Sequence, residues 1–142
     1  MTAPRLPRTR HGRRLLVLCL LALAACGCGG PAAREDAALR AGLAFEEALA
    51  AGEHVRACAL LAPSTRQDLE QGERQPCAKA LAAEELPRAG AVRGVDAYGR
   101  QAMVRMSGDT LFLSQFTSGW KVVAAGCTPE PEKPYHCLVK GA

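Results

Sequence analysis

The chain has 142 residues, enough for one domain of ordinary size and too few for two. Its formal charge is +4, but five of its 18 lysines and arginines and none of its 14 acids precede residue 25, so the remainder carries a charge of about −1. No basic stretch with interleaved aromatic residues remains, and we therefore expect no nucleic-acid partner.

Residues 1–25 have the pattern of a secretory signal peptide. Five arginines precede or open the apolar run 15–25, which is shorter than the roughly 20 residues that a membrane-spanning helix needs. We predict that this segment directs export and is no part of the fold. The adjacent Arg13 and Arg14 leave open whether export follows the general or the twin-arginine route.

The apolar run ends in LLALAACGCGG (20–30), and its tetrad LAAC (23–26) resembles the bacterial lipobox. The resemblance implies that the Cys26 thiol receives diacylglycerol and that a signal peptidase cuts before it. The mature chain would then begin at Cys26, held by its acyl chains on the outer face of the cell membrane. The alternative is ordinary secretion, with cleavage near Ala24 or Ala25. Residues 26–34 are predicted as a tether, in which Cys28 is an odd thiol.

The first part of the domain, from residue 35, has the periodicity of helices. Apolar residues recur at intervals of three and four from 32 to 51, which predicts a helix of about five turns ended by Gly52. Shorter helices are predicted over 53–61, 64–69 and about 76–85. The sequence Ser-Thr-Arg-Gln at 64–67 matches a capping box for the second of these.

Before Pro87 the apolar residues recur every three or four positions, as in a helix. After Pro87 they recur at every second position, as in a strand. The runs 92–98, 100–106, 110–117 and 120–126 are separated by glycine-containing turns, which predicts an antiparallel meander, and CLVKG (137–141) can add a short fifth strand. Helices followed by such a sheet indicate the α+β class. Apolar residues on both faces of the last two long runs predict a sheet that is covered on both sides or curved around an interior.

Four cysteines remain in the body of the domain, and export places them where disulfides persist. Cys127 and Cys137 bracket TPEPEKPYH, whose three prolines predict an extended surface loop. Cys58 and Cys77 lie in two apolar helical patterns. Of the three connectivities that four cysteines allow, we expect the local one, Cys58 with Cys77 and Cys127 with Cys137, each contributing on the order of 3 kcal/mol.

The arrangement of elements resembles the cone-shaped nuclear transport factor 2-like fold. GDTLFLSQFTSGWKVVAAGC (108–127) is similar to the final hairpin of that family, in which an aromatic residue opens the last long strand after a turn. The chain is also similar to small lipoproteins of high-GC Gram-positive bacteria. The resemblance spans roughly residues 35–141 and implies N-terminal helices packed on a curved antiparallel sheet of four or five strands.

Enzymes with this fold place a carboxylate or a His/Asp pair inside the cone as general acid or base. The comparable residues here are Asp96 and Tyr98 in the first strand run, with His54 on the second helix and Trp120 as core or pocket lining. The chain has no Gly-x-Ser-x-Gly elbow and no phosphate-binding glycine loop after a strand. The chain has no Cys-x2-Cys pair, and the spacings of its cysteines with His54 and His136 match no zinc site, so we expect no metal. We expect no other cofactor either.

These patterns together predict a non-enzymatic, membrane-anchored extracytoplasmic domain. Its expected partners are the membrane, through the lipid on Cys26, and either another envelope protein or a small hydrophobic ligand. The alternative is a cone-pocket enzyme of the isomerase, dehydratase or cyclase type, with Asp96 as the general base. The position of Asp96 separates the two, because a general base must face the pocket.

Overall fold

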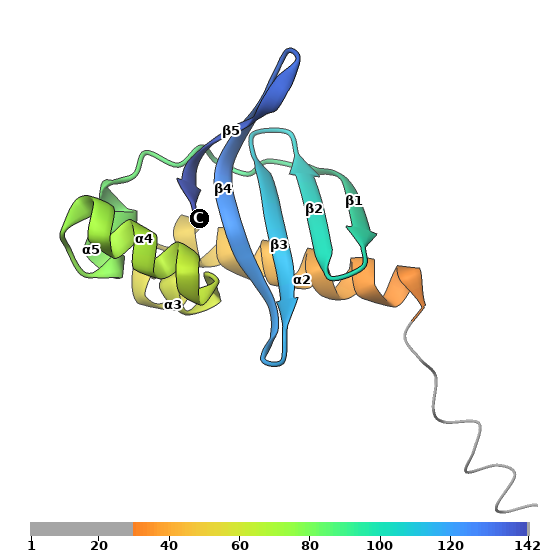
Figure 1. Cartoon of the computed structure of the whole chain (residues 1–142), viewed down its shortest axis with the longest axis horizontal. Helices are drawn as coiled ribbons and strands as arrows, with labels where there is room; N and C mark the ends of the chain where they lie inside the picture. The colour runs from red at the N-terminus through yellow and green to blue at the C-terminus, as the bar shows by residue number, and fades with distance from the viewer. Residues whose placement is uncertain (1–29, 142) are drawn as a thin grey trace, which may run out of the picture. The chain divides into compact units, whose positions relative to one another are not determined.

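The computed structural model describes residues 30–141, and in these residues four helices precede a five-stranded antiparallel sheet (Figure 1). This confirms the α+β class. The helices are α2 (Pro31–Ala50), α3 (His54–Leu60), α4 (Pro63–Glu73) and α5 (Cys77–Ala83). The strands pair in sequence order and are β1 (Val92–Tyr98), β2 (Gln101–Met106), β3 (Thr110–Phe116), β4 (Gly119–Glu130) and β5 (Lys133–Lys140).

Helix α2 runs across the strands and packs its apolar stripe against β1 to β4 (Figure 1). Ala38, Phe45 and Ala48 on this stripe are fully buried. Gly42 is also buried on this stripe, where a Cβ would be in ordinary van der Waals contact with Leu111 Cδ1 at 3.4 Å. The helix ends before Gly52, whose φ of 72° is typical of a glycine after a helix terminus. Since α2 begins at Pro31, residues 31–34, predicted as tether, are helical.

The short helices α3, α4 and α5 gather beside the C-terminal end of α2 (Figure 1). Helix α4 begins earlier than predicted, with Pro63 in its first turn and Ala62 as its N-cap residue, so the expected capping box is not formed. The reason is tertiary: the Ala62 N–H donates to the Val122 carbonyl of β4 at 2.8 Å, which fixes the chain just before the helix. Proline is tolerated in the first turn of a helix, because N–H groups there have no acceptor within the helix.

The segment between Cys127 and Cys137 is a strand hairpin, and the prediction of an extended surface loop there is wrong. Strand β4 continues to Glu130 and β5 begins at Lys133, and the hairpin projects from the sheet (Figure 1). Beyond Ala124, β4 is no longer paired with β3, so one edge of the strand is open. A proline is tolerated there, because no neighbouring strand needs the N–H that proline lacks. Pro129 lies at the irregularity between Thr128 and Glu130, where the ladder is interrupted.

Both disulfides join the cysteines that the sequence paired. Cys58–Cys77 connects α3 to the start of α5. Cys127 and Cys137 are direct partners in the β4–β5 register, so their bond connects adjacent strands and does not pin the two ends of a loop.

The hydrophobic core lies between the helices and one face of the sheet. The fully buried large side chains include Phe45 of α2 and Leu81 of α5 on the helical side, and on the sheet Val104, Leu111, Leu113, Val122 and Val139. On the other face Phe112 is half-buried and meets the ring of Tyr135 edge-on, with ring centroids 5.1 Å apart. Pro31–Ala142 is a compact unit that contains this core and both disulfides, so it meets the usual conditions for folding alone.

Candidate functional site

The structure does not bring Asp96, Tyr98 and Trp120 together in one pocket. Asp96 is exposed, and the Arg105 guanidinium donates a hydrogen bond to its Oδ2 at 2.6 Å. Tyr98 is 91% exposed at the end of β1, whereas Trp120 is buried in the core. His54 is the first residue of α3. Cys26 lies outside the described residues.

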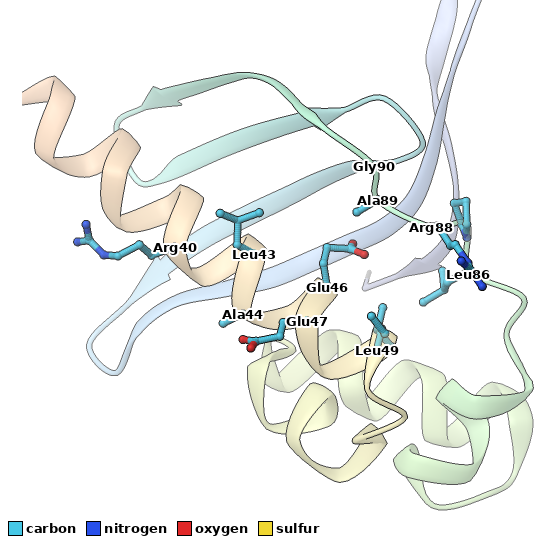
Figure 2. A pocket seen from close by; sticks show the side chains of 12 residues that line it. Arg40, Leu43, Ala44, Glu46, Glu47, Leu49, Leu86, Arg88, Ala89 and Gly90 are labelled. Carbon is cyan, nitrogen blue, oxygen red and sulfur yellow. The ribbon is translucent and has the colours of Figure 1, made fainter.

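A pocket of about 1020 Å³ lies elsewhere, between α2 and the segment 86–90 that leads into β1 (Figure 2). Apolar side chains form most of both walls, with Leu43 and Leu49 on the helix and Leu86 on the opposite segment. The charged side chains at the pocket differ in burial: those of Arg40, Glu47 and Arg88 are exposed, and only Glu46 is buried. The complete lining is Arg40, Leu43, Ala44, Glu46, Glu47, Leu49, Ala50, Leu86, Pro87, Arg88, Ala89 and Gly90.

The wall formed by residues 86–90 is held in place by the turn between β2 and β3. The Gly108 N–H donates to the Ala89 carbonyl and the Ser107 N–H to the Ala91 carbonyl, both at 2.8 Å. Gly108 has to be a glycine, because a Cβ there would collide with the Arg88 carbonyl. The turn that the sequence predicted only as a connection between strands therefore also docks the pocket wall.

Asp109 follows this turn and turns its carboxylate inward, where it is held by backbone donors. Its Oδ1 accepts hydrogen bonds from the N–H groups of Thr110 at 2.6 Å and Cys127 at 2.9 Å, and its Oδ2 accepts one from Gly126 at 3.0 Å. In a regular strand, successive N–H groups point to opposite sides. Gly126 has a φ of 65°, which lets the N–H groups of Gly126 and Cys127 both reach the Asp109 carboxylate. Asp109 is only 5% exposed.

Glu46 of α2 faces Asp109 and forms a buried carboxyl pair with it. Burial, the negative charge of Asp109 and a hydrogen bond with its carboxylate raise the pKa of Glu46 to about 8. Burial also raises the pKa of Asp109, while its three backbone donors and Glu46 oppose that shift. Because the negative charge on Asp109 helps to raise the pKa of Glu46, Glu46 holds a proton at neutral pH and donates it toward Asp109.

Sequence reasoning missed both members of this pair. A signal for Glu46 was present, because it lies four residues after Gly42 and eight after Ala38, on the buried stripe of α2. A carboxyl group on such a stripe needs a buried partner. The partner could not be identified, since Asp109 follows Ser107 and Gly108 and has the sequence context of an ordinary turn residue.

No helix within residues 30–141 is long and apolar enough to cross a membrane. The same part of the chain contains no group of three or more His, Cys, Asp or Glu side chains placed to hold a metal ion. Comparison with protein-family models, with curated proteins and with solved structures gave no match.

Proposed function

We propose that this protein is a lipid-anchored, non-enzymatic extracytoplasmic binding module, which takes up a small and largely apolar ligand between α2 and residues 86–90. The observation that carries the proposal is the pocket itself. It has apolar walls on both sides and a single buried polar side chain, Glu46. Small-molecule sites are usually of this kind, mostly apolar with a few placed polar groups that orient the ligand.

The location is proposed from the sequence, with the lipid on Cys26 as the anchor. Because α2 begins at Pro31, only four residues separate Cys26 from the folded domain. Four extended residues span at most about 14 Å, so the domain would sit close to the membrane surface. A ligand that partitions into or out of the membrane would have a short path to such a domain.

We also propose that the domain is a variant of the nuclear transport factor 2-like cone. The support is the long first helix, which lies across one face of an antiparallel sheet whose strands follow one another in sequence order. No observation favours the alternative of an enzyme with Asp96 as general base. Asp96 lies outside the pocket and is paired with Arg105 at the surface.

Metabolic labelling with an alkyne fatty acid tests the anchor. We expect label on the wild-type protein, none on Cys26→Ala and undiminished label on Cys28→Ala, which is the matched control two residues away. Label that persists on Cys26→Ala would refute the assignment of the lipidated residue.

Binding of an apolar fluorescent probe, N-phenyl-1-naphthylamine, to residues 31–142 tests the pocket. Ala50→Trp places a large ring at the pocket, at an exposed position at the end of α2, and should abolish the fluorescence increase. Val55→Trp is the control, since Val55 is 77% exposed and lies outside the pocket. Equal probe binding by both variants would contradict the proposed site.

A further inference from the structure

The buried carboxyl pair indicates which chemical class of ligand the pocket binds. This inference rests on the proposal that the pocket is the binding site. Glu46 is 8% exposed, lines the pocket, and points its carboxyl group toward the segment that carries Ala89 and Gly90 (Figure 2). Its Oε1 is enclosed and receives no hydrogen bond from any donor within residues 30–141. The side chain is thus a buried acceptor at a pocket, with only the proton that it shares with Asp109.

The negative charge of the pair has no cationic partner in the described part of the chain. Asp109 is held by three backbone N–H groups, and no lysine, arginine or histidine side chain there forms an ion pair with either carboxyl group. A buried charge without a counter-charge is costly, and an opposite charge brought to it at low dielectric is strongly attracted.

The other charged groups around Glu46 do not supply that counter-charge. Arg40 and Glu47 on α2 point away from Glu46 (Figure 2), and Glu47 is paired with Arg56 at 3.2 Å. Arg88, on the opposite wall, is exposed to solvent. Exposed charges are screened by salt and water much more strongly than buried ones, so the interior of the pocket keeps the negative character of the carboxyl pair.

We propose that the pocket binds an organic cation of the primary alkylamine class, whose ammonium group donates hydrogen bonds to the Glu46 carboxyl and whose alkyl chain lies against Leu43, Leu49 and Leu86. An ammonium group has three donors and no acceptor, which suits a carboxyl group that lacks donors. An alcohol of the same length supplies one donor without the charge. A carboxylate supplies charge of the wrong sign.

Binding of the ammonium is coupled to a proton. In the free protein Glu46 is protonated below its pKa of about 8. Beside an ammonium group the ionised form is favoured, so the proton leaves Glu46 for the solvent and no covalent bond changes. The affinity for an amine therefore rises with pH up to about that value and levels off above it, until the amine itself loses its charge.

Isothermal titration calorimetry of residues 31–142 with n-octylamine, n-octanol and octanoate tests this inference. We expect octylamine to bind most tightly, with an affinity that rises by up to about tenfold per pH unit between pH 6 and 8. Titrations in two buffers of different ionisation enthalpy should show proton release with octylamine and none with octanol. In Glu46→Gln the amine should lose both its pH dependence and its advantage over octanol, while Asp96→Asn, which removes an exposed carboxylate outside the pocket, should behave as wild type.

The possible results are distinguishable. Octanol or octanoate binding to the wild type as tightly as octylamine would overturn the amine assignment and leave the pocket proposal standing, and so would a pH profile that is unchanged in Glu46→Gln. Failure of all three compounds to bind would refute the proposed pocket together with this inference. The wild-type pH profile and the buffer comparison need no variant, so the inference remains open to refutation if Glu46→Gln does not fold.

Discussion

Replacing Glu46 by glutamine should remove most of the fall in stability that the wild-type domain shows as pH rises from 5 to 9. Glutamine keeps the shape of the protonated carboxyl group and can donate an N–H to Asp109, but it cannot ionise. The pKa of Glu46 is about 8 in the folded domain, against an ordinary value of 4.5, which we take for the unfolded chain. Between these values the folded state holds one proton that the unfolded state has released, so the free energy of unfolding decreases with rising pH.

The size of the effect follows from that difference in pKa. Each pH unit inside this window costs up to about 1.4 kcal/mol, and the whole window up to about 5 kcal/mol. The contribution is fully present below pH 4.5 and is lost as pH rises through 8. The two proteins should therefore be of similar stability near pH 5, and Glu46→Gln should be more stable by several kcal/mol at pH 9. Asp109 has a raised pKa in the wild type and adds a decrease of the same sign.

Urea denaturation of residues 31–142, followed by circular dichroism at pH 5, 6, 7, 8 and 9 with the disulfides intact, measures this difference. Glu47→Gln is the matched control, because Glu47 is the neighbouring residue on α2 and its side chain is 71% exposed. The control should follow the wild-type pH dependence. If wild type and Glu46→Gln lose stability in parallel over this range, the shared proton is not on Glu46 and the reasoning fails.

Three further tests concern Asp109, Gly126, whose N–H donates to it, and the α3–α5 disulfide. Asp109→Asn places an amide N–H against backbone donors and should lower the free energy of unfolding at pH 7 by about 1–3 kcal/mol, measurable by urea denaturation; an unchanged midpoint would contradict the hydrogen-bonded role of the carboxylate. Gly126→Ala should destabilise clearly more than Gly99→Ala: both positions have positive φ, but a Cβ at 126 would lie 2.8 Å from Leu86 Cδ2, whereas nothing lies within 4 Å at 99. Equal melting temperatures of these two variants would argue against the close contact. Removal of the α3–α5 disulfide by Cys58→Ser with Cys77→Ser should cost about 2–5 kcal/mol, and a melting temperature equal to that of the wild type would show that the bond adds no stability.

Local patterns in the sequence were enough for the order and class of the elements. The spacing of apolar residues predicted α2 and the strands, because each period places one row of side chains on one face of an element. The glycines predicted the turns, and nearness along the chain predicted both disulfides. The helices, turns and disulfides depend on residues that are close in the sequence, and the folded structure contains them.

Tertiary structure decided where α4 begins, how far the last hairpin extends and where the candidate site lies. Pro129 and Pro134 argue against strands locally, but a hairpin with open edges accommodates them, and no local pattern shows which edges are open. Glu46 and Asp109 are separated by three helices, two strands and the turns between them. Glu46 lies on the buried stripe of α2, but nothing in the sequence identifies Asp109 as its partner. Only the packing of α2 on the sheet excludes water from both carboxyl groups at once, and this exclusion gives the pair its shared proton.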